Sequence, residues 1–172
     1  MTDISTLVAD VVIRVAADGE GDIEAIARLR REWADEQGGP RAGIAAPEPQ
    51  VAMDGGLEPR FADWYLAESG RRVTWLAELD GRPVGMVSLV VFSRMPRPDA
   101  PEGGWGYLSN AFVLAAYRNR GVGGRLLAGL LEYASDQHLA RVVLSPSERS
   151  VPFYQRAGFG PADMLLAKVL AG

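Results

Sequence analysis

The sequence predicts a mixed α/β domain whose twisted sheet is largely antiparallel at first and parallel in its middle. Strand-sized apolar runs alternate with segments of helical periodicity along the 172 residues. The dipeptide Asp80-Gly81 between two apolar runs indicates an antiparallel hairpin. Farther along, a strand, a helix and a strand with short connections predict a right-handed parallel crossover. A chain of this length buries about two-thirds of its surface around one core, so a single domain over residues 1–172 is expected.

The composition is that of a globular protein, and it excludes several classes of function. Hydrophobic residues make up 48% of the chain and charged residues 23%. The formal net charge is −4, so the chain lacks the positive field that binding to a nucleic-acid backbone requires. The absence of cysteine rules out disulfides and zinc–thiolate sites. We therefore expect neither a nucleic-acid partner nor a metal site.

The first ten residues are expected to form a loose arm without a targeting function. They carry Asp3 and Asp10, and they lack the basic region and long apolar run of a secretory signal. The longest apolar stretches elsewhere, such as residues 84–92, fall far short of the roughly 20 residues that a membrane span needs. These observations predict a cytoplasmic protein with no membrane partner.

The first third of the chain is expected to hold one strand, one helix and a long loop. A β-branched run at residues 11–15 predicts the first strand. Asp22 stands where an N-cap is needed, ahead of apolar residues at helical spacing, and predicts a helix that ends at Gln37. Residues 38–60 contain five glycines and four prolines, which indicates an irregular loop of a length that is usually functional in compact domains.

The remaining elements follow from apolar periodicity and from the glycines and prolines between them. Helices are expected at residues 61–68, from the glycine cluster to 137, and at 151–157; strands are expected at 73–79, 84–92, 107–114, 141–145 and 159–170, with a second loop at 94–106. The prediction is therefore a sheet flanked by about four helices.

The glycine cluster at the start of the long helix is the most informative segment. Gly121, Gly123 and Gly124 fall in the first turn, where each costs about 1 kcal/mol of helix stability relative to alanine. A ligand pressed against the bare backbone would offset this cost, because the first N–H groups of a helix lack partners and attract anions. Alternatively, the glycines only permit a tight turn and close packing on the sheet. Dinucleotide and P-loop motifs are absent, which disfavours a nucleotide-binding protein.

Two short motifs resemble the signatures of the GNAT N-acetyltransferases. The pattern Arg118-x-x-Gly121-x-Gly123 follows an apolar strand and looks like the acetyl-CoA signature of that family. Residues 153–159 (FYQRAGF) resemble its second signature. The resemblance extends over residues 11–169. It implies a GNAT-like acyl-CoA N-acyltransferase fold, a single N-acetyltransferase domain, and a substrate-side loop at residues 38–60.

The resemblance implies an enzyme, an acetyl-CoA-dependent N-acetyltransferase. An acceptor amine would attack the acetyl group of acetyl-CoA directly in a ternary complex, and Tyr154 would protonate the departing thiolate as general acid. The other interpretation of Tyr154 is an aromatic side chain packed beneath the last helix. The acceptor is left open between a small-molecule amine and a protein N-terminal or lysine amine. A homodimer is also expected, because members of the family often dimerise.

The resemblance also assigns residues to the cofactor. The end of the signature strand would offer backbone groups to the pantetheine arm, and the start of the following helix would surround the diphosphate. Ser147 replaces an asparagine that many relatives carry; it can donate one hydrogen bond to the cofactor or, like Ser150, cap a helix. The cofactor-binding residues expected on this basis are Ala111, Phe112, Val113, Arg118, Asn119, Arg120, Gly121, Val122, Gly123, Gly124 and Ser147.

The group that removes a proton from the amine is the least defined part of the site. Tyr107 and Ser109 occupy strand positions that carry a base or hold a water in some relatives, and neither is a good base. Glu102 and Glu78 are the nearest carboxylates, so relay through a water is the default expectation. The lack of an evident base keeps a second function open, a non-catalytic acyl-CoA-binding sensor or a subunit of a partner.

Overall fold

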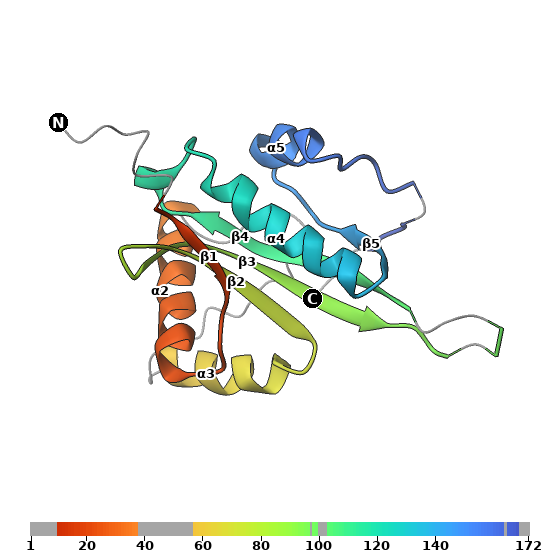
Figure 1. Cartoon of the computed structure of the whole chain (residues 1–172), viewed down its shortest axis with the longest axis horizontal. Coiled ribbons are helices and arrows are strands. Elements are labelled where there is room, and N and C mark those ends of the chain that lie inside the picture. The colour runs from red at the N-terminus through yellow and green to blue at the C-terminus, as the bar shows by residue number, and fades with distance from the viewer. Residues whose placement is uncertain (1–9, 38–56, 97, 100–102, 164, 169–172) are drawn as a thin grey trace.

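The computed structural model confirms the predicted mixed sheet with helices around it. It describes residues 10–37, 57–96, 98–99, 103–163 and 165–168. Five strands form one sheet in the order β1-β2-β3-β4-β5, antiparallel from β1 to β4 and parallel between β4 and β5 (Figure 1). The elements are β1 (Val12–Val15), α2 (Glu20–Gln37), α3 (Leu57–Glu68), β2 (Arg72–Leu79), β3 (Arg82–Ser93), β4 (Gly104–Val113), η1 (Ala115–Tyr117), α4 (Val122–Asp136), β5 (Leu139–Val143), η2 (Glu148–Ser150) and α5 (Val151–Arg156).

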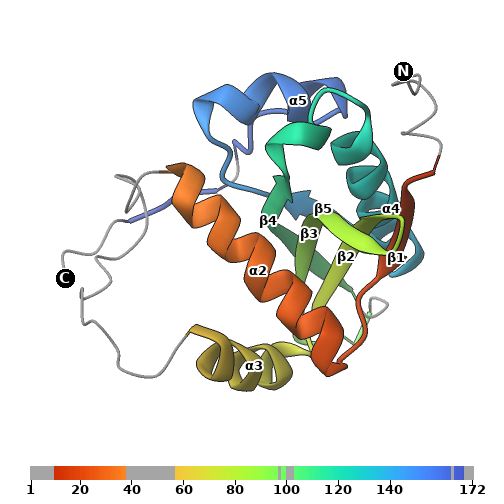
Figure 2. The ribbon, with the colours of Figure 1, turned by 90° about the vertical axis from the view of Figure 1, so that its left-hand side faces the viewer.

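Helices cover both faces of the sheet, and the strands supply side chains to two cores. α2 and α3 lie on one face and α4 on the other (Figure 2). Leu126 and Leu130 of α4 belong to a core with Trp75, whereas Leu29 of α2 shares the second core with Leu76. Successive residues of β2 thus serve opposite faces, as the pleat of a strand requires. None of the helices in the described residues is long and apolar enough to span a membrane.

The predicted strand–helix–strand crossover is present as β4, α4 and β5. Its parallel pair lies at an edge of the described sheet instead of in the middle, because residues 159–163 and 165–168 form no strand. The closing strand expected at residues 159–170 is therefore wrong for these residues, while 164, 169 and 170 lie outside the described residues. Pro161 interrupts the apolar run, and proline cannot donate to a strand ladder.

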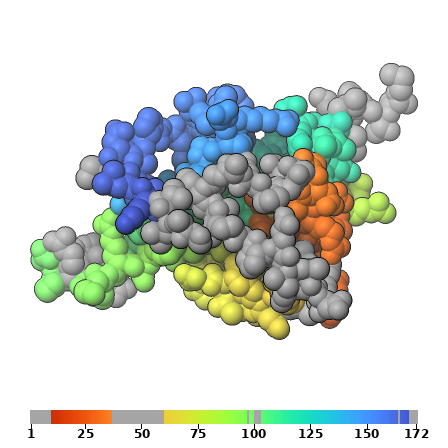
Figure 3. Space-filling view, turned by 180° about the vertical axis from the view of Figure 1, so that it is seen from behind, coloured from red at the N-terminus to blue at the C-terminus, as the bar shows by residue number. Residues whose placement is uncertain are grey.

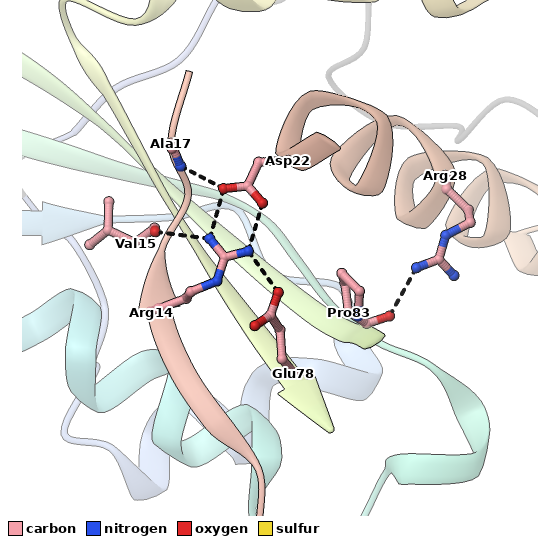
Figure 4. A network of polar contacts seen from close by, with 7 residues as sticks. All are labelled: Arg14, Val15, Ala17, Asp22, Arg28, Glu78 and Pro83. Carbon is pink, nitrogen blue, oxygen red and sulfur yellow. Dashed lines mark hydrogen bonds and ion pairs between the residues drawn. The ribbon is translucent and has the colours of Figure 1, made fainter. Parts of the chain in front are cut away.

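An ion-pair network joins the first strand to α2 and to β2 (Figure 4). Arg14 donates to the two carboxylate oxygens of Asp22 at 2.6 and 2.7 Å and to Oε1 of Glu78 at 2.6 Å. The Asp22 carboxylate also accepts the backbone N–H of Ala17 at 2.7 Å. The hydrogen bond from Arg14 lowers the pKa of Asp22. α2 begins at Glu20, so Asp22 lies within its first turn and the prediction of Asp22 as the N-cap is wrong.

The long loop predicted at residues 38–60 is shorter than expected at its C-terminal end. α3 begins at Leu57, and Pro59 stands in its first turn. Proline is tolerated there because the N–H that it lacks would have no intrahelical partner. Residues 38–56 of the predicted loop, like residues 1–9 of the predicted arm, lie outside the described residues.

β4 also starts earlier than predicted, inside the loop expected at residues 94–106. A Cβ atom at Gly104 would lie 2.7 Å from the carbonyl oxygen of Phe92, and one at Gly106 would lie 2.6 Å from Leu89. The contact at Gly104 is with backbone and excludes a side chain there, whereas the contact at Gly106 is with Cδ1 of Leu89, which would have to shift. These glycines therefore let β4 lie close against β3 instead of breaking the strand.

Replacing Asp22 by Asn should lower the free energy of unfolding by about 1–2 kcal/mol at pH 7, because Arg14 loses one of its two charged partners and keeps only Glu78. The folded protein holds the pKa of Asp22 below its value in the unfolded chain. The contribution is therefore present at neutral pH and is lost as the pH falls through the acidic range. Urea unfolding should show the difference between variant and wild type shrinking as the pH is lowered toward 3.

The control for this experiment is Glu24→Gln, an exposed position in the same helix. It removes a carboxylate without touching the network and should change the free energy of unfolding by less than about 0.5 kcal/mol. A wild-type advantage over Asp22→Asn that stays constant with pH would contradict the assigned role of Asp22.

Candidate functional site

β4 and β5 are paired only along the first part of β4. The last parallel pair is Tyr107–Val143, and β4 continues to Val113. Within the described sheet, residues 108–113 have β3 on one side and no strand on the other. Backbone N–H and C=O groups on the open side require partners, so this gap can accept a molecule with peptide-like groups.

A β-bulge interrupts β4 inside this gap. Between two paired positions β3 advances two residues, while β4 advances three, from Ser109 to Phe112. Asn110 takes a left-handed conformation with φ +54°, which asparagine tolerates better than most residues. The bulge removes backbone groups of Asn110 and Ala111 from regular pairing with β3. A hydrogen-bond donor for a ligand can therefore come from the backbone at this point.

The glycine-rich turn follows directly, because η1 connects the end of β4 to α4. Gly121 precedes α4 in a left-handed conformation with φ +82°, and its carbonyl accepts the first helical N–H. The N–H groups of residues 122–124 consequently have no acceptor within the helix. A Cβ atom at Gly123 would lie 3.6 Å from the Phe153 ring, whereas one at Gly124 would have nothing within 4 Å. The backbone needs glycine at position 121, but no contact of the described chain requires it at 124, which favours a ligand there.

Arg118 is engaged by the protein itself. Its Nε donates to the Val113 carbonyl at 2.7 Å, and its guanidinium pairs with Glu36 of α2 and lies 5.4 Å from the centre of the Phe112 ring. Arg118 thus ties the end of β4 to α2 and keeps only part of its donors for a diphosphate. Arg120 is half-buried and makes no hydrogen bond or ion pair with another described residue.

Ser147 and Ser150 lie after β5 and interact with each other. The Ser147 hydroxyl donates to the Ser150 hydroxyl at 3.0 Å, and the Ser150 hydroxyl donates to the Ser147 carbonyl at 2.9 Å. Neither side chain makes a capping hydrogen bond to the helix that it precedes. The side-chain capping expected as an alternative is therefore wrong. In this structure the Ser147 donor is directed at Ser150.

Tyr154 of α5 is buried within a cluster of aromatic rings. Only 8% of it is exposed, and its ring meets those of Phe153 and Phe159 edge-on at 5.0 and 5.7 Å. Burial raises the pKa of the phenol above its usual value. The hydroxyl therefore stays protonated at neutral and mildly alkaline pH, a state compatible with either role considered for this residue.

The predicted proton acceptors that the structure describes lie in different surroundings. Glu102 lies outside the described residues, and the Glu78 carboxylate is bound by Arg14. Tyr107 is about one-third exposed and occupies the last position at which β4 pairs with β5. Ser109 precedes the bulge, and its Oγ accepts hydrogen bonds from Arg72 and Asn110. Of these groups, Tyr107 and Ser109 lie on β4 beside the gap.

Sequence reasoning missed Arg72, which lies next to Ser109. Arg72 opens β2 and extends on the face covered by α3, where its guanidinium contacts Trp64 and Glu68. Seen from behind, α2, α3 and α5 all border one face of the molecule (Figure 3). The sequence signal that could have identified Arg72 was the alternation of side chains along a strand. It puts Arg72 on the same face of β2 as the buried Thr74 and Leu76.

Comparison with known proteins identifies relatives of the whole described fold. The model of the acetyltransferase (GNAT) family matches residues 26–159. A glucosamine 6-phosphate N-acetyltransferase of Trypanosoma brucei brucei is 35% identical over 81 residues, which cover 46% of this chain and 52% of that protein. The match thus spans about half the length of that curated relative.

Two solved structures illustrate the likeness in three dimensions. A predicted acetyltransferase from Clostridium acetobutylicum, solved with acetyl-CoA, superposes with a TM-score of 0.70 at 19% identity and covers 92% of this chain and 96% of that chain. A GCN5-related N-acetyltransferase from Ralstonia eutropha JMP134 gives a TM-score of 0.68 at 26% identity, covering 94% and 99% of the two chains.

Proposed function

Because the chain belongs to the acetyltransferase (GNAT) family, we propose that it transfers the acetyl group of acetyl-CoA directly to an acceptor amine within a ternary complex. The observation that carries this proposal is the continuous open surface formed by β4 and the start of α4. Within the described sheet, β4 runs without a parallel partner beyond Tyr107 and leads through η1 into a helix start whose first N–H groups have no acceptor within the helix. Strand backbone suits the amides of a pantetheine arm, and the helix start suits a diphosphate.

The cofactor-binding residues proposed are those on this surface. Ala111, Phe112 and Val113 offer backbone groups to the pantetheine arm, and residues 119–124 offer N–H groups to the diphosphate. Arg118 and Arg120 add positive charge beside it, Arg118 in the reduced degree that its pairing with Glu36 allows. Ser147 would contribute only after releasing Ser150.

The acyl transfer needs three events that residues of this site can support. The neutral amine attacks the carbonyl carbon of the thioester, and the negative charge that forms on the oxygen is stabilised by a backbone N–H at the bulge, near Ala111. The carbon–sulfur bond then breaks, and the coenzyme A thiolate takes the phenol proton of Tyr154. The surplus proton of the amine leaves through water beside Tyr107 and Ser109, and the Tyr154 phenolate regains a proton from solvent.

A small-molecule amine is the acceptor that we propose. The relative that is 35% identical is named for glucosamine 6-phosphate, an amino sugar that carries a phosphate. A protein N-terminal or lysine amine is the competing acceptor. A panel of both kinds, assayed by release of the coenzyme A thiol, tests the choice.

The test of the function begins with cofactor binding. Acetyl-CoA and coenzyme A should each raise the melting temperature, whereas ATP and NAD should not. Release of the thiol that depends on an added amine then separates an enzyme from a sensor that only binds acyl-CoA. Binding of acetyl-CoA without acetylation of any amine in the panel would favour the sensor.

Tyr154→Phe should lower kcat at least about tenfold, because the departing thiolate loses its proton donor. The dissociation constant for acetyl-CoA should stay unchanged, since the phenol is proposed to act only in the chemical step. Steady-state kinetics and calorimetric titration measure the two quantities. Tyr133→Phe, which removes a hydroxyl from a partly buried tyrosine of α4, is the control. Unchanged turnover in Tyr154→Phe would leave Tyr154 as a packing residue.

Gly124→Ala should move stability and cofactor affinity in opposite directions. Alanine favours the helix by up to about 1 kcal/mol, and its Cβ has no described residue outside its own helix backbone within 4 Å, so the melting temperature should rise or stay equal. The dissociation constant for acetyl-CoA should increase about tenfold, because the methyl group occupies space needed by the diphosphate.

Gly21→Ala is the matched control for Gly124→Ala, because a Cβ there also meets nothing within 4 Å and Gly21 lies in the first turn of a different helix. It should change stability in the same sense and leave the affinity for acetyl-CoA unaltered. Equal affinities of Gly124→Ala and wild type would indicate that this glycine serves only the turn.

A further inference from the structure

Arg72, the first residue of β2, is a buried cation with one donor left over. Its side chain is 10% exposed and lies over the ring of Trp64, 4.9 Å from the ring centre. Nη1 donates to Ser109 Oγ at 3.2 Å, and Nη2 lies 3.6 Å from Oε2 of Glu68. The Nε atom is buried and has no hydrogen-bond partner among the residues that the structure describes. A buried N–H without an acceptor is uncommon in folded proteins, so this one calls for an explanation.

Among the described residues, the positive charges around Arg72 outnumber the negative ones. Glu68 accepts a hydrogen bond from Arg71 at 2.7 Å through Oε1 and faces Arg72 only through Oε2, at the longer distance. One carboxylate therefore serves two guanidinium groups. Arg71 is half-exposed and solvated, whereas Arg72 is enclosed. The excess positive charge thus resides where water screens it least, and an anion entering this place would be attracted strongly.

Ser109 adds a second donor beside Arg72. Its Oγ accepts hydrogen bonds from Arg72 and, at 3.4 Å, from the side-chain amide of Asn110. Both lone pairs are then used, so the hydroxyl hydrogen remains to be donated. Asn110 accepts in turn from Arg30 of α2, which orients its amide toward Ser109. The cluster therefore presents donors and positive charge, while its own acceptors are occupied.

We propose that Arg72 and Ser109 form a subsite for an oxyanion on the acceptor molecule, either a phosphate or a carboxylate. A guanidinium matches both groups through its planar fork of N–H donors. The inference rests on the proposed function, because it assigns a second group to the acceptor whose amine meets the acetyl group at the bulge.

The spacing along β4 restricts the acceptor further. Ser109 and Ala111 are two residues apart, at most roughly 7 Å along a strand. An amine at the bulge and an anion at Ser109 therefore lie within the reach of one small molecule. The subsite consequently suits a compact metabolite that carries both an amine and a phosphate or carboxylate.

The first experiment measures anion binding without turnover. The protein is saturated with coenzyme A, so that its phosphate-binding surface is filled, and is then titrated with inorganic phosphate or acetate at matched ionic strength. At least one anion should raise the melting temperature of wild type and of Arg28→Gln, an exposed arginine of α2. It should not do so for Arg72→Gln. Equal responses of wild type and Arg72→Gln, or no response in either, would overturn the subsite.

The second experiment uses matched acceptors, namely glucosamine, glucosamine 6-phosphate and 2-amino-2-deoxyglucuronic acid. Wild type should prefer one charged sugar over glucosamine at least about tenfold in kcat/KM, and the preferred one identifies the anion. Arg72→Gln should abolish the preference through KM, with the KM for acetyl-CoA unchanged. Glu68→Gln should strengthen it, because the competing carboxylate is gone. Arg72→Lys keeps the positive charge and should retain part of the preference for the charged sugar. It therefore distinguishes loss of the charge from a folding defect caused by the substitution.

The two proposals fail in different ways. Acetylation of all three sugars without a preference would overturn the anion subsite and leave the acetyltransferase function standing. Binding of acetyl-CoA with no acetylation of any amine would overturn the function, and the anion titration would then decide whether Arg72 binds an oxyanion in its own right.

Discussion

The parting of β4 from β5 is the constraint on which the rest of the site depends. Within the described sheet it leaves residues 108–113 with a ladder on one side only, although polar backbone groups are unfavourable when they lack partners. The pairing stops because β5 ends at Val143, opposite Tyr107, whereas β4 continues to Val113. A ligand with amides can complete the ladder locally. The proposed binding of the cofactor to β4 therefore depends on the geometry of the backbone more than on particular side chains.

α2 is attached beside this opening by polar contacts spread along its length. Arg14 binds Asp22 near its start, Arg30 bonds to Asn110 of the bulge, and Glu36 pairs with Arg118 near its end. The apolar face of α2 supplies the burial, with Leu29 fully enclosed. The burial keeps the helix on the sheet, whereas the polar contacts determine how the bulge and the end of β4 face the site. Substitutions among them can alter the acceptor side while the core stays intact.

Local features of the fold could be predicted from the sequence, and long-range ones could not. The Asp80-Gly81 hairpin and the glycine-rich start of α4 depend on neighbours in the chain, and both are present. Gly104 was expected in a loop, because glycine often interrupts a strand. The structural reason for this glycine is the close carbonyl oxygen of Phe92, which lies on another strand. The expected closing strand had apolar residues, yet Leu166 is fully exposed and the run pairs with no described strand.

The same distinction between local and long-range contacts applies to the candidate site. The proposed cofactor surface could be formulated from the sequence because Gly121, Gly123 and Gly124 lie close together in the chain, directly after the strand that they follow. The Arg72 cluster could not, because Arg72 and Ser109 are separated by 37 positions and meet only through the pairing of β2, β3 and β4. The residues proposed for the cofactor thus stand in short motifs, whereas the residues proposed for the acceptor are brought together only by tertiary contacts.

The stacking of Arg72 on Trp64 has an optical consequence. The indole is 45% exposed and has a guanidinium charge over its ring, and indole emission responds to nearby charge. A group that neutralises Arg72 would alter the colour and yield of that emission. Trp75 is enclosed on the opposite face of the sheet against Tyr133 and would register such an event only weakly. Trp64 can therefore serve as an intrinsic fluorescent probe of the proposed anion subsite.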